Sequence, residues 1–519
     1  MAFESGGLSQ PRFATVAEAI ESHALARPSS VALCFESQEI TYAQLWQRVL
    51  YATHTLQTLG VTAGQRVAYL GLNSPAEMTL FIALSRLEAI FLPLNYRLAP
   101  AELSAILANA GVTLLVCDEA HEGTFQEVNT AVDQVKRARA AMFFDITAQP
   151  IDAPIEAPVK SCDPKAPALL VYTSGTTGKP KGALHTQAGL VANCIISIDA
   201  HDLTATDHVL TVLPLFHVGG LCIQTLPALY AGATVTLHAR FDAGAWLQAV
   251  AGQKPTLSLL VPATMRAVLD HADFDRADLS SLRLVNAGSS TIADALIAGF
   301  NARQVTVCQI YGATETGPVS IYLKARDAAQ RSGSAGKAGA GVDVRLVDAH
   351  GLDAVPGAVG ELWVRGPNVM QGYWQGDVPG DSHTSFENGW FKTGDLARCD
   401  ADGFYWVVGR SKDMIISGGE NIYPAEIENI LAGCPDIAES AVIGQPDAKW
   451  GEVAVAVVVV KPGSQLTAQA VMTLFNGKLA RYKQPRRIVF VPNLPKTATG
   501  KVNKQQLVAQ LDNAGTVSF

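Results

Sequence analysis

The sequence has no excess of positive charge, few cysteines and no long uninterrupted apolar run. Lysine and arginine total 39 against 47 acidic residues, and the net charge of -8 argues against a general nucleic-acid binder. The eight cysteines include no CxxC pair, so we expect reduced core residues. The most apolar early stretch, 78–94, is interrupted by Arg86 and Glu88, and the N-terminus lacks a basic region followed by an apolar one. We therefore expect no membrane span, no signal peptide, a cytoplasmic location and small-molecule partners.

The chain is long enough for more than one domain. Its 519 residues exceed the size at which single hydrophobic cores stop growing, and 48% of them are hydrophobic. The first part alternates amphipathic helices with short strands, with helix starts predicted at Thr15, Thr41 and Ser74 from their capping patterns. Toward the end, short strands alternate with helices in a smaller unit. We predict an α/β protein with a large N-terminal domain, 1–411, and a small α+β domain, 412–519.

Residues 172–182, YTSGTTGKPKG, have the composition of a phosphate-binding loop. Hydroxyl groups can donate hydrogen bonds to an anion, glycines let the backbone approach it, and lysines add positive charge. The apolar run 166–171 predicts a strand before the loop, and 184–198 predicts a helix after it, so the loop lies at a strand end where α/β folds bind ligands. Only two residues separate Gly175 from Gly178 and Lys179, and this spacing excludes a Walker A loop. A flexible linker is the alternative reading of the same residues.

A second polar turn, YGATETGP at 311–318, follows the apolar run 305–310. Tyr311 can stack on a base, Thr314 can donate to a phosphate oxygen, and Glu315 can bind Mg²⁺, which favours one or two carboxylates plus substrate phosphates. An ordinary polar turn would have the same sequence. The turn alone therefore leaves both interpretations open.

The run 172–182 resembles, almost residue for residue, the phosphate loop of the AMP-forming adenylating enzymes: acyl-CoA synthetases, firefly luciferase and the adenylation domains of peptide synthetases. The same family carries YGxTE at the position of 311–315. Further segments match in the family's order, the last being PxxxxGK at 495–501. The total is seven matching segments between 172 and 501. The resemblance covers essentially the whole chain. It implies a large domain of sheets and a distorted barrel, followed by a small mobile C-terminal lid.

The resemblance also assigns roles to residues. Glu315 would hold Mg²⁺, Asp395 would accept hydrogen bonds from both ribose hydroxyls, and Lys412 would be the hinge. The implied catalytic residues are Lys501, Glu315, Thr314 and His217. The implied ATP-binding residues are Thr173, Ser174, Gly175, Thr176, Thr177, Gly178, Lys179, Lys181, Gly288, Ser289, Ser290, Tyr311, Gly312, Ala313, Asp395 and Arg410. The implied CoA-side turn is Gly418 and Gly419, and the acyl pocket is Val218, Gly219, Gly220, Leu221, Ala287 and Pro318.

The implied reaction has two steps and uses ATP, Mg²⁺ and CoA. A carboxylate attacks the ATP α-phosphate to give acyl-AMP and pyrophosphate, and the thiol of CoA then displaces AMP. Because two anions must meet, we expect catalysis to rest on charge neutralisation and alignment, with no covalent enzyme nucleophile.

The acid is less closely defined. Peptide-synthetase adenylation domains have an aspartate where His217 stands, so an α-amino acid is not expected, and no carrier-protein domain follows Lys501. The small and apolar pocket residues predict a hydrophobic monocarboxylic acid with an alkyl chain or an aryl ring. The chain as a whole resembles fatty-acyl-CoA synthetases and hydroxycinnamate-CoA synthetases about equally, which implies a fatty or a hydroxycinnamic acid. A dicarboxylate paired with Arg266 ranks third, because the helix predicted around this arginine favours a solvated side chain. A catalytically reduced adenylate-binding protein and a luciferase-like oxygenase are further alternatives, and a homodimer is predicted.

Overall fold

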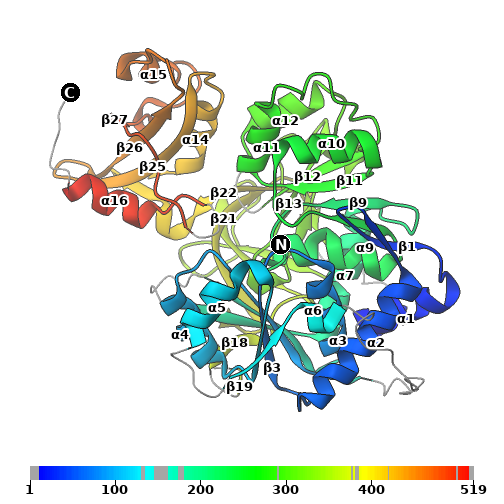
Figure 1. The fold of residues 1–519 in the computed structure, drawn as a ribbon. Helices are drawn as coiled ribbons and strands as arrows, with labels where there is room; N and C mark the ends of the chain where they lie inside the picture. The colour runs from blue at the N-terminus through cyan, green and yellow to red at the C-terminus, as the bar shows by residue number, and fades with distance from the viewer. Residues whose placement is uncertain are drawn as a thin grey trace.

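The computed structural model describes residues 11–129, 135–144, 162–173, 180–288, 292–375, 378–379, 385–418, 420–497 and 501–513. Two large mixed sheets form the body of the molecule, and a small domain coloured yellow to red lies to one side of them (Figure 1). No helix in the described part of the chain is long and apolar enough to cross a bilayer. The expected α/β class with a small C-terminal α+β unit is confirmed.

The first sheet has the strand order β19-β18-β8-β7-β4-β3-β5-β6. Strands β4, β3, β5 and β6 run parallel, while β8 pairs antiparallel with both β7 and β18. The strands are β3 (Arg66–Leu70), β4 (Ile90–Leu94), β5 (Leu114–Cys117), β6 (Lys136–Arg139), β7 (Pro167–Thr173), β8 (Lys181–Thr186), β18 (Gly372–Gln375) and β19 (Val378–Pro379).

The second sheet has the order β15-β14-β13-β12-β11-β9-β10-β1-β2 and is parallel from β13 to β1. Helices α10 (Ala243–Gln253), α11 (Pro262–Leu269) and α12 (Asp294–Asn301) lie beside it (Figure 1). Its strands are β1 (Val31–Phe35), β2 (Gln38–Thr41), β9 (His208–Thr211), β10 (Thr234–Leu237), β11 (Leu257–Leu260), β12 (Leu284–Ala287), β13 (Val307–Tyr311), β14 (Ile321–Tyr322) and β15 (Lys337–Ala338).

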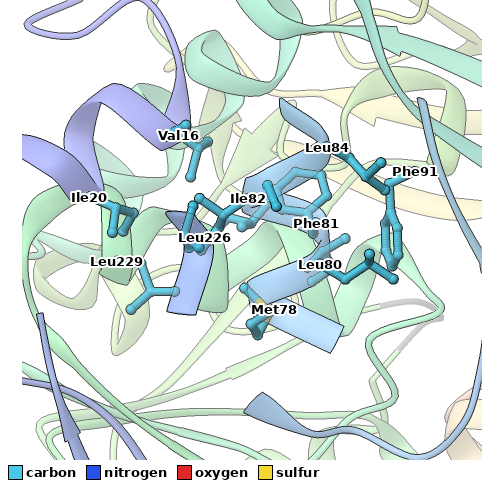
Figure 2. Close-up of a cluster of buried hydrophobic side chains, with 14 of the residues drawn as sticks. Val16, Ile20, Met78, Leu80, Phe81, Ile82, Leu84, Phe91, Leu226 and Leu229 are labelled. Carbon is cyan, nitrogen blue, oxygen red and sulfur yellow. The ribbon is translucent and has the colours of Figure 1, made fainter. Parts of the chain in front are cut away.

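The main hydrophobic core joins the two sheets through helices. It includes residues of α1 (Val16–Ala26), α2 (Tyr42–Thr58), α3 (Pro75–Arg86), α7 (Gln187–His201) and α9 (Leu226–Ala231), together with strand residues of both sheets. Figure 2 shows Val16 and Ile20 of α1 beside Leu226 and Leu229 of α9, with the apolar face of α3 next to Phe91. This shared core makes the two sheets one unit.

The predicted helix starts are present. Thr41 forms a full capping box with Gln44. The side chains of Thr15 and Ser74 each accept a hydrogen bond from the backbone three residues later. These hydroxyls satisfy N–H groups that have no partner within the helix.

The predicted helix over 184–198 is wrong at its start. Leu184 to Thr186 belong to β8, which pairs with β7 in the register Leu170↔Leu184. The helix α7 begins at Gln187, where the Thr186 side chain caps it. A short apolar run fits a buried strand as well as a helix, and pairing with β7 decides between them here.

A third, antiparallel sheet follows the two large ones. Its order is β16-β17-β21-β20, and β22 pairs antiparallel with β21 at 395–399, where Asp395 and Arg410 are cross-strand partners. The strands are β16 (Asp343–Val347), β17 (Val359–Arg365), β20 (Phe386–Glu387), β21 (Trp390–Cys399) and β22 (Tyr405–Arg410).

The C-terminal part has its own sheet and cores. The sheet has the order β24-β23-β26-β25, with β27 parallel to β26. The short 3₁₀ turn Ser411–Asp413 precedes this part of the chain. No hydrophobic cluster of the described residues has members on both sides of that turn. The elements are β23 (Ile415–Ser417), β24 (Glu420–Ile422), α14 (Pro424–Ala432), β25 (Ile437–Asp447), β26 (Gly451–Val460), α15 (Ala468–Thr473), β27 (Arg487–Phe490) and α16 (Lys504–Asn513).

Polar contacts connect the two parts. Asn429 of α14 exchanges two hydrogen bonds with Asp294 at the start of α12, both at 3.0 Å. Arg266 of α11 donates to the carbonyl of Ala432 at 3.5 Å, so this arginine contacts the C-terminal part. Lys461 lies 3.7 Å from the carboxylate of Asp270. Figure 1 shows α14 on the side of the small domain that faces α11 and α12.

Candidate active site

Most of the predicted site residues lie at the ends of strands or in the turns that follow them. Tyr311 ends β13, Glu315 is in the 3₁₀ turn Thr314–Thr316, and Asp395 and Arg410 are on β21 and β22. The predicted residues Ser174, Gly175, Thr176, Thr177, Gly178, Lys179, Ser289, Ser290 and Gly419 lie outside the described residues.

Asp395 is buried and joins Tyr311 and Arg410 in one polar group. Its carboxylate accepts a hydrogen bond from the Tyr311 hydroxyl at 2.7 Å and one from the Arg410 guanidinium at 2.8 Å, on different oxygens. Burial and the Asp395 carboxylate raise the pKa of Tyr311, so the phenol stays protonated and donates. The same carboxylate raises the pKa of Arg410. Each carboxylate oxygen has a second lone pair, so Asp395 can still accept hydrogen bonds from a ligand.

The backbone around Asp395 is fixed locally. Thr393 donates its hydroxyl to the Leu362 carbonyl at 2.6 Å and accepts from the Asp395 N–H at 3.0 Å. Gly394 has φ +70° and its N–H donates to the Glu361 carboxylate. A positive φ is the reason that this position favours glycine.

The turn 311–318 needs glycine for a different reason. A Cβ on Gly312 would stand 1.7 Å from the carbonyl oxygen of Pro318, and one on Gly317, at φ +89°, would stand 2.3 Å from the carbonyl oxygen of Asn368. Ala313 donates its N–H to the Thr316 hydroxyl at 2.8 Å. The turn is therefore packed backbone against backbone, which fixes the position of Glu315.

Glu315 is held at its backbone and at its side chain. The N–H of Met370 donates to the Glu315 carbonyl at 2.8 Å, and the hydroxyl of Tyr373 donates to Oε1 at 2.7 Å. Among the described residues, no group of three or more His, Cys, Asp or Glu side chains could hold a metal ion by itself. A single carboxylate with one oxygen engaged by a phenol fits Mg²⁺, which binds through one or two carboxylates and substrate phosphates.

Lys501 is surrounded by protein atoms on one side and is exposed to solvent on the other. Desolvation by the surrounding protein and the charge of Arg410 lower its pKa, while the carboxylates of Asp395 and Glu315 raise it. Much of the residue is exposed. The C-terminal part thus brings its lysine within electrostatic range of both predicted nucleotide-site carboxylates.

His217 lies near this lysine. Burial, together with the smaller effects of the charges of Lys501 and Arg97, lowers its pKa to about 4. Its Nε2 is buried and has no hydrogen-bond partner among the described residues. The His217 and Phe216 rings lie tilted against each other with their centroids 4.5 Å apart, and the edge of Phe216 also contacts Tyr96. A neutral imidazole with an unpaired nitrogen beside a lysine could bind a polar group of a substrate.

The remaining predicted pocket residues are mostly buried. Val218, Leu221 and Ala287 have little or no exposed surface. A Cβ on Gly220 would meet the Pro214 carbonyl oxygen at 2.2 Å, and one on Gly288 would meet the Ile310 carbonyl oxygen at 2.9 Å. These two glycines therefore allow close backbone contacts. Gly219 is half-buried and Pro318 is buried.

The segments on either side of the predicted phosphate loop are strands. Thr173 ends β7, and its hydroxyl donates to the carbonyl of Lys181, which begins β8, at 3.4 Å. The Nζ of Lys181 lies 5.2 Å from the centroid of the Tyr373 ring. The strands before and after the predicted loop thus pair antiparallel in one register.

The predicted hinge and CoA-side turn lie next to each other in sequence. Lys412 is exposed, in the 3₁₀ turn Ser411–Asp413. Gly418 has φ +61°, its N–H donates to the Trp450 carbonyl at 2.7 Å, and a Cβ there would meet the Trp450 ring at 2.8 Å.

Sequence reasoning missed two side chains of this region, Tyr373 and Arg97. A tyrosine in a strand is typical of core packing, and an arginine after a strand is typical of solvent exposure, so neither had a sequence signal of its own. Each is recognised only by what it approaches, Glu315 in one case and His217 in the other.

The family models agree with the arrangement of two parts. The model of the AMP-binding enzyme family matches residues 20–374, and that of the AMP-binding enzyme C-terminal domain matches 426–501. Indoleacetate–CoA ligase of Aromatoleum aromaticum is 45% identical over 95% of this chain and 98% of the relative. Feruloyl-CoA synthase of Amycolatopsis sp is 40% identical over 92% and 96%, and long-chain-fatty-acid–CoA ligase FadD13 of Mycobacterium tuberculosis is 32% identical over 91% and 93%.

Solved structures give the same result. The anthranilate CoA ligase AuaEII in complex with anthranoyl-AMP superposes with a TM-score of 0.90 at 28% identity, covering 97% of this chain and 99% of that one. ATP-bound MatB from Rhodopseudomonas palustris superposes with a TM-score of 0.86 at 28% identity, covering 97% and 100%.

Proposed function

This chain belongs to the AMP-binding enzyme family and is an AMP-forming acid–CoA ligase, and from that premise we propose that its preferred acid carries an aromatic ring. The observation that carries the proposal is the identity of 45% with an indoleacetate–CoA ligase and 40% with a feruloyl-CoA synthase, against 32% with a fatty-acid ligase. The aromatic pair Tyr96 and Phe216 beside His217 supports it, because ring edges and faces favour an aromatic partner.

In the adenylation step, the proposed work of the protein is alignment and charge neutralisation. Lys501 would stand between the acid carboxylate and the α-phosphate, and Asp395 would accept hydrogen bonds from the ribose. Mg²⁺, held by Glu315, would neutralise phosphate charge. His217 would border the carboxylate, and Thr314 and the loop 173–181 would donate to phosphate oxygens.

In the second step, the C-terminal domain would turn and present another face. We place the domain boundary at 411/412, because the hydrophobic clusters separate there, and we place the hinge at Lys412. Gly418 and Gly419 would then form the turn beside the CoA thiol. A homodimer also stays a prediction, which light scattering at several protein concentrations checks.

A panel of acids tests the proposal: indoleacetate, ferulate, benzoate, octanoate, palmitate, acetate and malonate, scored by pyrophosphate release and by CoA-dependent AMP formation. Aryl acids should have the highest kcat/KM, and hydrophobic monocarboxylates should exceed acetate by roughly tenfold or more, because a few buried methylenes at ~0.8 kcal/mol each account for that difference. Highest activity on octanoate or palmitate would contradict the aromatic preference. Highest activity on acetate or malonate would contradict the hydrophobic pocket as well.

A further inference from the structure

Tyr373 contacts two charged groups of the proposed phosphate site. Its hydroxyl donates to Glu315 Oε1 at 2.7 Å, and its ring lies 5.2 Å from the Nζ of Lys181. One group is the proposed Mg²⁺ ligand, and the other follows the phosphate loop. They have opposite charge and come from segments more than 130 residues apart, as the numbering shows.

The position of Tyr373 is itself fixed by the first sheet. It lies on β18, where it is the cross-strand partner of Ala183 on β8, two residues after Lys181. The neighbouring Met370 donates its N–H to the Glu315 carbonyl at 2.8 Å. The segment 370–373 therefore holds Glu315 by its backbone and by its side chain.

The turn that carries Glu315 also forms hydrogen bonds with Asn368, which lies just before this segment in the chain. Asn368 donates its side-chain amide to the carbonyls of Thr316 and, at 3.2 Å, Val319, and Asn368 is fully buried. A carboxylate with one oxygen bound by a fixed phenol can turn only a little about its terminal torsion. Its second oxygen, Oε2, is then directed to one place, which suits a cation that accepts little variation in coordination geometry.

The ring adds a second constraint. A lysine ammonium above an aromatic face is attracted to it by about 0.5–2 kcal/mol. Without this contact the flexible Lys181 side chain would have more rotamers to lose when it meets a phosphate. The tyrosine thus orders an anion-binding group and a cation-binding group together.

We propose that Tyr373 is a positioning residue for adenylation, which sets the Glu315 carboxylate with its hydroxyl and the Lys181 ammonium with its ring. The proposal rests on the proposed function of this site. It predicts that the two contacts affect different measurements. The hydroxyl affects the Mg²⁺ concentration that adenylation requires, and the ring affects the affinity for the nucleotide phosphates.

Two variants separate them. Tyr373→Phe keeps the ring and removes the hydroxyl, and Tyr373→Leu removes both. In Tyr373→Phe the Mg²⁺ concentration for half-maximal pyrophosphate release should rise roughly tenfold, the scale of one hydrogen bond to a charged group. ATP binding without Mg²⁺, measured by titration calorimetry, should be unchanged in Tyr373→Phe and weaker in Tyr373→Leu.

The matched control is Tyr322→Phe. It removes a buried phenol that also donates to a carboxylate, that of Asp199, which is not among the proposed site residues. The control should leave the Mg²⁺ dependence unchanged, and all three variants should convert supplied acyl-AMP and CoA to thioester at the rate of the unaltered enzyme.

An unchanged Mg²⁺ dependence in Tyr373→Phe would overturn the proposal, and so would an equal loss in both half-reactions. The calorimetric experiment does not depend on the acid. If the unaltered enzyme released no pyrophosphate with any acid of the panel, the proposed function would fail, while ATP binding without Mg²⁺, equal in Tyr373→Phe and weaker in Tyr373→Leu, would still decide the part of the ring.

Discussion

At the scale of single residues, a few charged side chains determine the electrostatics of the site. Lys501 lies within range of one cation, Arg410, and two carboxylates, Asp395 and Glu315. His217 has a lowered pKa that keeps the ring neutral, and its buried Nε2 has no partner in the part of the chain that the structure describes. The positive charge of the lysine is therefore available for a ligand, and it reaches the site only because the C-terminal part lies against the large one.

The first prediction concerns this lysine. Lys501→Ala should lose acyl-AMP formation by roughly 10²-fold or more, the scale seen when one preorganised donor is removed from a transition state. It should still convert supplied acyl-AMP and CoA to thioester. Rapid-quench measurements of each half-reaction check this. Lys496→Ala, which removes an exposed lysine paired with Glu439, is the control and should affect neither step. An equal loss of both steps would show that the assigned role is wrong.

The second prediction concerns pH. Burial lowers the pKa of His185, His201 and His217 to about 4, while an unfolded chain has histidines near 6.5. Between these values the unfolded state binds more protons, so the free energy of unfolding should fall as the pH falls from about 6.5 to about 4. Each histidine contributes at most about 1.4 kcal/mol per pH unit. Outside that window these groups should contribute no slope.

Calorimetric melting temperatures over that pH range check the sign. His201→Gln, which changes a histidine outside the predicted site, should make the decline less steep. A decline of the same steepness in the variant would exclude His201 as one of its sources.

At the scale of elements, the turns are set by backbone contacts that only glycine permits. The turn 311–318 is the strongest case, because Gly312 has no room for a Cβ beside the Pro318 carbonyl. Thr314 and Glu315 follow within three residues, so a shift of the backbone moves both.

The third prediction follows from that turn. Gly312→Ala should reduce adenylation by at least about tenfold and lower the melting temperature, since backbone atoms cannot move aside cheaply. Gly252→Ala is the matched control: this glycine is in α10 and has open space around it. The control should be neutral or stabilising, by up to about 1 kcal/mol. Pyrophosphate-release assays and thermal melts of both variants decide the matter, and normal adenylation in Gly312→Ala would contradict the reading of the turn.

The sequence predicted elements well where local chemistry decides them. Capping at Thr41 and the helix that begins at Pro424 depend on neighbouring residues only, and both are present. The run from Leu184 to Thr186 was assigned wrongly because pairing with β7, a tertiary contact, decides its conformation.

The same distinction applies to the site. The roles of Lys501, Glu315 and Asp395 were inferred from motifs, and their proximity is seen only in the structure. Tyr373 and Glu315 belong to no common sequence motif, so no sequence pattern could predict their contact. Side chains that support a site from another strand are the part that sequence reasoning does not reach.

At the scale of the whole molecule, the connection between the two parts is short. β22 ends at Arg410, the 3₁₀ turn Ser411–Asp413 follows, and the C-terminal sheet begins at Ile415. Any rotation of the small domain must be absorbed by backbone torsions in this turn, which is where we place the hinge.

The fourth prediction tests the hinge. Proline fixes φ near about −65°, a value compatible with the 3₁₀ turn seen here, so Lys412→Pro should favour the present arrangement. It should retain pyrophosphate release and lose thioester formation from supplied acyl-AMP. Lys412→Ala should be far milder, since it removes only the side chain. If proline slowed both half-reactions equally, or neither, the pivot would have to lie elsewhere.

The polar boundary between the two parts has a thermal consequence. Heat capacity changes when apolar surface is exposed or covered, by about +0.45 cal/K/mol for each Å² exposed. Polar contacts across the boundary join Asn429 with Asp294, Arg266 with Ala432 and Lys461 with Asp270, and no hydrophobic cluster of the described residues crosses it, so a swing of the small domain should uncover little apolar surface. Its heat-capacity change should be close to zero. A van 't Hoff plot of the two arrangements should therefore be straight, and the enzyme should keep a similar ratio of them from cold to warm conditions.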